Sequence, residues 1–296
     1  MVKDLEPQTW RDVYFTVRDG LRLHARHYPA PGSTRRPVLC LPGLTRNSQD
    51  FHRLAKELGD PRGHRRAVYA VDYRGRGLSE HDKDWKNYSP LIECLDVLDL
   101  LAMEGLSDCA VLGTSRGGLV AMILALMQPA AIGTVILNDI GPEIERAGLT
   151  RIIGYVGKVP VPIDWKEATG IVHSMNRRFF TQLSEADWEA FARASFLDLN
   201  GLPAPSYDPA IARTMSISDI ANGIPTMWPQ FDALCRVPML AIRGENSDVL
   251  SPETLRKMQD RHKNMRTITV PGQGHAPLLI DEPTIGEISD FLIDTD

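Results

Sequence analysis

The sequence contains few cysteines and no long hydrophobic segment. The four cysteines, at positions 40, 94, 109 and 235, lie far apart and form no C-x-x-C pair, which favours reduced thiols over a disulfide framework. The longest apolar run is residues 119–127, nine in number, whereas a helix needs roughly 20 apolar residues to span a bilayer. The first residues lack the apolar segment of a secretory signal. We therefore expect a cytoplasmic protein with no membrane span.

An excess of positive charge, metal-ligand clusters and dinucleotide-binding motifs are also missing. The chain has 33 Lys and Arg against 38 Asp and Glu, a net charge of −5, which disfavours nucleic acid as a partner. No set of His, Cys, Asp and Glu residues has metal-ligand spacing. Residues 72–79 contain Asp-x-x-Gly-x-Gly, but they lack the third glycine and the following helix of a dinucleotide fingerprint. We expect no metal and no cofactor, and no feature indicates an oligomeric state.

Short apolar segments alternate with segments of helical spacing along most of the chain. Continuous apolar runs are typical of strands covered on both faces, and they occur at residues 37–41, 67–71, 109–112, 134–137 and 238–242. A further strand is expected at residues 267–270. Two earlier segments, 13–17 and 21–28, alternate apolar and polar residues around Asp19-Gly20, which indicates a β-hairpin. Strands that alternate with helices predict an α/β fold with a mostly parallel, doubly wound sheet.

The alternation is interrupted once, between residues 143 and 232. This stretch has no strong strand signal and contains amphipathic helical segments at 164–175, 184–196 and 208–221. Ligands of open α/β sheets bind at the carboxyl edge of the strands. We therefore predict a core formed by residues 1–142 and 233–296, with residues 143–232 inserted as a helical cap over that edge.

A candidate nucleophile lies between a predicted strand and a predicted helix. Residues 113–117 read Gly-Thr-Ser-Arg-Gly and fit the G-x-S-x-G nucleophile elbow, in which a sharp turn exposes a serine. Gly113 and Gly117 would let two backbones pass close to Ser115. The following helix would direct its free N–H groups toward developing negative charge. Because short glycine and serine patterns are common, other loops must supply a base and an acid.

Two further loops at predicted strand ends carry such groups. A serine hydroxyl is a weak nucleophile and needs an adjacent base, and His275 follows a glycine-rich turn after a strand. The second ring nitrogen of such a base needs a carboxylate, and we choose Asp248 for that role. Glu245, in the same loop, and Asp139, at the end of the strand before the cap, remain alternatives for the acid.

These motifs resemble those of capped α/β-hydrolase-fold esterases, lactonases and C–C hydrolases. The resemblance covers almost the whole chain and is most specific at residues 72–79, 113–117, 243–248 and 271–277. It implies a serine hydrolase that cleaves a small-molecule carboxylic ester or lactone through an acyl-enzyme. Ser115 would be the nucleophile, His275 the base and Asp248 the acid, although some relatives carry the acid at the position of Asp139.

Several other functions use nearly the same residues. A serine at the elbow argues against the dehalogenase and epoxide-hydrolase relatives, which carry a carboxylate there. Hydrolysis of a C–C bond in a ring-cleavage product and hydrolysis of a thioester remain alternatives within the enzymes. A ligand-binding receptor on the same fold is the alternative outside them.

The resemblance also implies an oxyanion hole made of two backbone N–H groups, those of Leu44 and Arg116. Many relatives carry His-Gly in the first of these loops, whereas this chain has Pro42-Gly43. The support that such a histidine gives must then come from another residue, with Arg46 and Asn47 as candidates.

The side chain of Arg116 and the substrate pocket are less constrained by the sequence. An arginine after the nucleophile would either attract an anionic substrate or pair with an acid such as Asp139. For the pocket we expect Trp228 and Phe231, where the cap returns to the sheet, together with Asp139.

Overall fold

Eight strands form one sheet in the computed structural model, which describes residues 9–60, 65–216 and 224–296. The order across the sheet is β1-β2-β4-β3-β5-β6-β9-β10. Strand β2 is antiparallel to β1 and β4, and all other pairs are parallel. The strands are β1 (Arg11–Thr16), β2 (Arg22–Tyr28), β3 (Val38–Leu41), β4 (Val68–Asp72), β5 (Cys109–Thr114), β6 (Ile132–Asn138), β9 (Met239–Gly244) and β10 (Met265–Val270). The predicted α/β fold with a mostly parallel sheet is confirmed.

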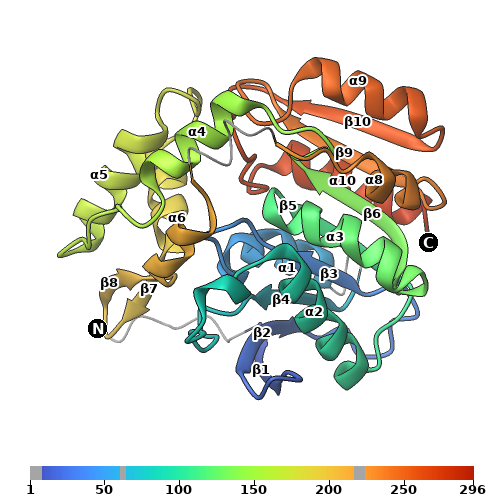
Figure 1. Ribbon diagram of the computed structural model, residues 1–296, viewed down its shortest axis with the longest axis horizontal. Coiled ribbons are helices and arrows are strands. Elements are labelled where there is room, and N and C mark those ends of the chain that lie inside the picture. Colours follow the sequence, from blue (N-terminus) through green and yellow to red (C-terminus); the bar gives the residue numbers. More distant parts are fainter. Residues whose placement is uncertain (1–8, 61–64, 217–223) are drawn as a thin grey trace.

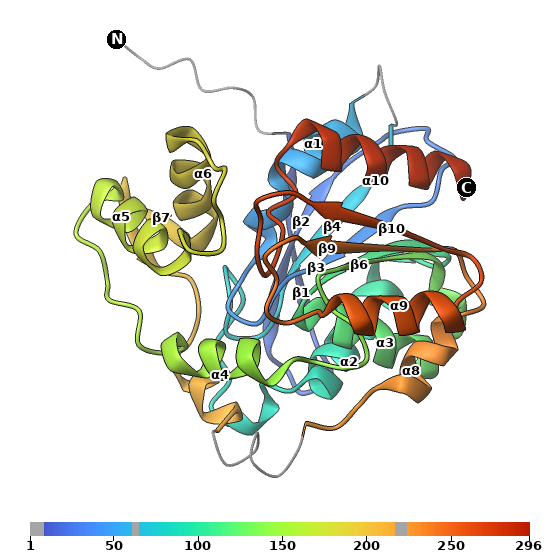
Figure 2. The same cartoon turned by 90° about the horizontal axis from the view of Figure 1, so that it is seen from above.

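Helices cover both faces of the sheet, as Figure 2 shows. On one face lie α1 (His52–Gly59), which follows the 3-10 helix η1 (Ser48–Phe51), and α10 (Glu282–Asp294). On the other face lie α2 (Pro90–Glu104), α3 (Arg116–Met127), α8 (Trp228–Leu234) and α9 (Pro252–Arg261). Strands β3, β4, β5 and β9 are buried along their whole length, which explains their continuous apolar sequences. None of the described helices is long and apolar enough to cross a membrane.

Most of the chain between β6 and β9, from residue 146 to residue 214, leaves the sheet and forms a separate layer beside it (Figure 1). This layer contains α4 (Arg146–Tyr155), α5 (Trp165–Asn176), α6 (Glu185–Ser195), the hairpin β7 (Phe196–Leu199) and β8 (Leu202–Pro205), and the 3-10 helix η4 (Pro209–Thr214). The hairpin was not predicted, because β8 is short and carries two prolines, residues that weaken strand signals.

The end of the predicted cap differs from the expectation. The described part of the predicted helix at 208–221 contains the 3-10 helix η4 in place of an α-helix, and residues 217–223 lie outside the described part of the chain. Helix α8 then packs against α3 in the core layer. The division of the chain at residues 143 and 232 stays a prediction.

The strand register brings two loops to the same point. Thr114 at the end of β5 pairs with Asn138 at the end of β6, so Ser115 and Asp139 follow neighbouring strand ends. Strands β9 and β10 continue the same parallel row. The loops after four successive strands therefore meet at one edge of the sheet.

Candidate active site

Ser115 lies at the N-terminus of α3 in a strained backbone conformation. Its φ is 51° and its ψ is −112°, a combination that L residues rarely adopt. A Cβ on Gly117 would lie 2.0 Å from the carbonyl oxygen of Leu41, and one on Gly113 would lie 2.6 Å from the backbone of Gly117. Only glycine fits at these two positions, so the turn has the geometry expected of a nucleophile elbow.

A continuous chain of hydrogen bonds runs from Ser115 through His275 to Asp139. Ser115 Oγ lies 2.7 Å from His275 Nε2, and His275 Nδ1 lies 2.8 Å from Asp139 Oδ2. A carboxylate only accepts hydrogen bonds, so Nδ1 carries the ring proton and Nε2 faces the serine as an acceptor. The His275 side chain is 7% exposed and that of Asp139 is fully buried.

Asp139 is held by the loop that follows β9. Its carboxylate accepts hydrogen bonds from the backbone N–H of Gly244 at 2.8 Å and from the Ser247 hydroxyl at 2.6 Å. With His275 this makes three donors to one buried carboxylate. Such contacts fix the orientation of the carboxylate toward His275.

The predicted contact between Asp248 and His275 is wrong. Asp248 instead pairs with Arg151 of α4, at 2.6 and 2.8 Å. Burial works to raise the pKa of Asp248, but the hydrogen bonds and charge of Arg151 outweigh it and hold this pKa below its usual range. Glu245, the other acid of this loop, accepts the N–H of Gly272 at 2.7 Å.

The Arg116 side chain points away from Ser115 into a buried ionic cluster. Arg116 Nε donates to Glu93 at 2.7 Å, and Arg76 Nη1 donates to the same carboxylate at 2.9 Å. Arg76 and Glu93 are fully buried. The expectation that Arg116 pairs with an acid is confirmed, but the acid is Glu93 of α2 and not Asp139.

The same cluster reaches the loop that contains Leu44. Arg76 Nε donates to the Leu44 carbonyl oxygen at 2.9 Å, so Arg76 supports this loop from beneath. Sequence reasoning missed both Arg76 and Glu93. The available signal was a glutamate at a helix position where the neighbouring residues are apolar, because a buried acid needs a buried cation.

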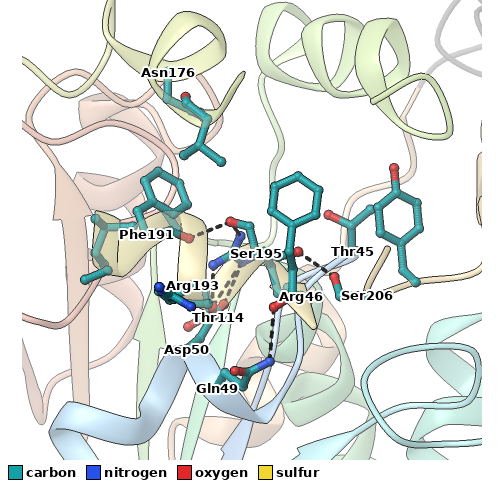
Figure 3. Close-up of a pocket in the computed structure, with 18 of the residues that line it drawn as sticks. Thr45, Arg46, Gln49, Asp50, Thr114, Asn176, Phe191, Arg193, Ser195 and Ser206 are labelled. Carbon is teal, nitrogen blue, oxygen red and sulfur yellow. Dashed lines mark hydrogen bonds and ion pairs between the residues drawn. The ribbon is translucent and has the colours of Figure 1, made fainter. Parts of the chain in front are cut away.

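Arg46 and Asn47 connect the Leu44 loop to the cap. Figure 3 shows Arg46 hydrogen-bonded to both Asp50 and Ser195. Asn47 Nδ2 donates to the Ala194 carbonyl at 3.3 Å. The two residues proposed as supports of the loop therefore bind helix α6, while Arg76 holds the Leu44 carbonyl.

Ser115 and His275 open into a cavity of about 950 Å³ between the sheet edge and the cap. Its wall includes Leu44 from the core and, from the cap, Ile152, Tyr155, Val159, Met175, Phe191 and Tyr207. No group of three His, Cys, Asp or Glu residues among those described is arranged to hold a metal ion.

The predicted pocket residues do not line this cavity. Phe231 is fully buried in the core beneath the sheet. Trp228 packs on it and donates Nε1–H to Glu143 at 2.8 Å. Asp139 is enclosed behind His275. The pocket prediction is wrong for all three, because Trp228 and Phe231 belong to α8, which packs in the core layer, and Asp139 is hydrogen-bonded behind His275.

Known proteins resemble the chain along nearly its whole length. Residues 38–285 match the sequence profile described as "Alpha/beta hydrolase family". The 3-hydroxybutyrate-oligomer hydrolase of Cupriavidus necator is 31% identical over 283 residues, 92% of this chain and 93% of that protein. The sn-1-specific diacylglycerol lipase ABHD11 of Danio rerio is 26% identical over 234 residues, 75% of this chain and 67% of that protein.

A solved structure is also similar. The crystal structure of an alpha/beta hydrolase from Novosphingobium aromaticivorans aligns with a TM-score of 0.88 and 38% sequence identity. The alignment covers 97% of this chain and 99% of that one. The similarity therefore includes the cap as well as the sheet.

Proposed function

The chain belongs to the alpha/beta hydrolase family, and from that premise we propose that it is a serine hydrolase that cleaves carboxylic esters or lactones through an acyl-enzyme. The observation that carries this proposal is the hydrogen-bonded chain Ser115–His275–Asp139, whose serine opens into the cavity. A buried chain of this kind supports an enzyme over a receptor, because a receptor needs no activated hydroxyl.

The proposed reaction begins with attack of Ser115 Oγ on the ester carbonyl carbon. His275 Nε2 takes the hydroxyl proton, and the Asp139 carboxylate stabilises the imidazolium that forms. His275 then gives this proton to the leaving alcohol oxygen as the C–O bond breaks. A water molecule attacks the acyl-enzyme, losing its proton to His275, and Ser115 regains that proton when the carboxylic acid leaves.

We assign the oxyanion hole to the N–H groups of Leu44 and Arg116. Arg116 lies in the first turn of α3, where backbone N–H groups have no acceptor within the helix. Both residues are tied to Glu93, Leu44 through Arg76 and Arg116 directly. Arg76 and Glu93 are therefore positioning residues, since they fix the separation between the two donors without touching the substrate. Removal of one such donor typically costs roughly 100- to 1000-fold in rate.

Within the esters, we propose short linear oligoesters of 3-hydroxy acids as substrates. The support is the similarity to the Cupriavidus necator 3-hydroxybutyrate-oligomer hydrolase along nearly the full length of both chains. The cavity of about 950 Å³ is large enough for a ligand of several units.

The test uses the purified protein with three substrates: p-nitrophenyl butyrate, the methyl ester of the 3-hydroxybutyrate dimer, and a γ-lactone. A fluorophosphonate probe reports the activated serine independently of substrate choice. We expect hydrolysis of the linear esters, labelling at Ser115, and loss of both in Ser115→Ala. A folded wild-type protein that neither hydrolyses any of the three nor reacts with the probe would refute the proposal.

A further inference from the structure

Among the described residues that line the cavity, positive side chains outnumber negative ones, although the chain has a net charge of −5. Four arginines stand against two carboxylates; these residues are Arg26, Arg46, Arg53, Arg193, Asp50 and Asp187. A cavity with a local charge opposite to that of the whole protein favours anionic ligands.

Two of the four arginines already have acidic partners. Arg46 pairs with Asp50. Arg193 lies 3.5 Å from both Glu189 and Asp198. Arg26 and Arg53 are different, because neither forms an ion pair with any residue in the described ranges.

The Arg26 guanidinium is stacked on an aromatic ring, and one of its donors has no acceptor among the described residues. It belongs to β2, and its central carbon lies 4.5 Å from the centroid of the Trp10 ring. Its Nε is buried and has no hydrogen-bond partner among the described residues. Asp12, opposite Arg26 across the β1–β2 pair, accepts instead from Trp10 at 3.2 Å and from His24 at 3.0 Å. A buried donor without an acceptor is costly, and a carboxylate would match the planar guanidinium.

Arg53 also lines this cavity. The Trp10 ring that carries Arg26 also contacts the ring of His52, at 5.1 Å between centroids. Arg53 follows His52 in the first turn of α1. Trp10 therefore contacts Arg26 and the residue that precedes Arg53, and Trp10, Arg26, His52 and Arg53 all line the cavity that contains Ser115.

The part of the cavity that Arg26 and Arg53 line lies between the core and the cap. Residues of α1 and of α6 line the same cavity, and Figure 2 shows these two helices facing each other, beside β2. Ser115 lies at the sheet edge, after β5. An extended ligand would therefore place one end at the serine and the other between α1 and α6.

We propose that Arg26 and Arg53 bind the carboxylate of an anionic ester. This inference rests on the proposed function and narrows it to oligoesters that end in a free carboxylate. The carboxylate belongs to the leaving alcohol: Ser115 takes the acyl group, and the released hydroxy acid carries its carboxylate at the two arginines. The alcohol oxygen receives its proton from His275, so no further reactant is needed.

The experiment compares the 3-hydroxybutyrate dimer and trimer as free acids with the same compounds as methyl esters. Wild-type protein is expected to have a kcat/KM at least tenfold higher for the acids. Arg26→Gln and Arg53→Gln should each reduce this ratio about tenfold, mainly through KM, because each removes a charge-assisted hydrogen bond. Arg53→Glu should reverse the preference. Arg256→Gln, an exposed arginine on α9 away from the cavity, is the matched control and should keep the wild-type ratio.

The outcomes separate this inference from the proposed function. Equal kcat/KM for acid and methyl ester in the wild type would overturn the subsite while leaving the hydrolase intact. The subsite would also be overturned if Arg26→Gln and Arg53→Gln both kept the wild-type ratio of kcat/KM between acid and methyl ester. No hydrolysis of either compound, with no fluorophosphonate labelling, would instead refute the hydrolase itself. Arg53→Gln changes an exposed side chain, so it tests the subsite even if Arg26→Gln impairs folding.

Discussion

The loops after β6 and β9 each present an aspartate near His275, and the two aspartates differ in what surrounds them. Asp139 is fully buried and accepts from His275, Ser247 and Gly244. Asp248 is partly exposed and is neutralised by Arg151 of the cap. Proximity to the histidine thus does not decide the role of a carboxylate. The Asp248 carboxylate is already paired with a guanidinium, whereas the Asp139 carboxylate is hydrogen-bonded to the imidazole of His275.

The largest effect should come from Asp139→Asn. An amide at this position would donate to Nδ1 and favour the ring tautomer that leaves Nε2 unable to accept the serine proton, so kcat should fall by about ten-thousandfold. Asp248→Asn is the matched control, and its kcat should stay within a few-fold of wild type. Steady-state kinetics on p-nitrophenyl butyrate measures both. The comparison of the two loops fails if the Asp248 variant loses more activity than the Asp139 variant.

A second effect concerns the cluster beneath the oxyanion donors. Glu93→Gln should lower kcat about tenfold to a hundredfold with KM nearly unchanged, because small displacements of positioning groups are costly. Affinity for a boronic acid transition-state analogue should fall by the same factor. Stability should fall by about 3–5 kcal/mol, since the variant leaves buried arginines unpaired. Glu57→Gln, which replaces an exposed glutamate on α1, is the control and should leave kcat, the affinity for the analogue and the stability unchanged. A stability loss without any change in kcat would make the cluster purely structural.

Most of the fold could be predicted from local sequence, and so could Ser115 and His275, two of the three residues in the hydrogen-bonded chain. Continuous apolar runs identified the strands, and the glycines around Ser115 identified the elbow, because each depends on neighbours in the chain. His275 was recognisable for the same reason. Asp139 and Asp248 were not separable, because β6 and β9 are adjacent and both loops end near the histidine. The burial of Asp139 with its donors Gly244 and Ser247, and the pairing of Asp248 with Arg151, 97 residues earlier in the sequence, distinguish them. These contacts all depend on the tertiary structure.

The cap and the ionic cluster were also only partly predictable from local sequence. The hairpin of β7 and β8 was missed although its turn, Asn200-Gly201, is a local hairpin signal, because the prolines in β8 weaken the strand pattern. Glu93 and Arg76 contact each other across separate elements, so neither reveals its role alone. Trp228 and Phe231 were assigned to the cap by their place in the sequence, although α8 had already returned to the core.

A third, smaller effect is the stability contributed by the Asp248–Arg151 pair. Asp248→Asn should lower the free energy of unfolding by about 1 kcal/mol at pH 7, since the pair is partly exposed. Thermal or urea unfolding measures this difference. A change of several kcal/mol would show that the cap depends on this contact far more than its exposure implies.

The same pair predicts the sign of a pH effect. The pKa of Asp248 is held below its ordinary value of 3.8 in the folded protein, so the folded state binds fewer protons there than the unfolded state. The contribution of the ion pair to the free energy of unfolding is fully present above the ordinary pKa of an aspartate. It is lost as the pH falls through the lower pKa that Asp248 has in the folded protein. The stability difference between wild type and Asp248→Asn should therefore be constant at neutral pH and shrink in acid. A difference that grew in acid would contradict the assignment of the ion pair.

The most direct test of the central claim is the proton NMR signal of His275 Nδ1–H. Its hydrogen bond to a buried carboxylate should give a strongly downfield resonance, which His275→Gln identifies by its disappearance. The contacts predict that this resonance persists in Asp248→Asn and is lost or moves far upfield in Asp139→Asn. Persistence in Asp139→Asn with loss in Asp248→Asn would show that Asp248 orients His275 and that the account given for the two loops is wrong.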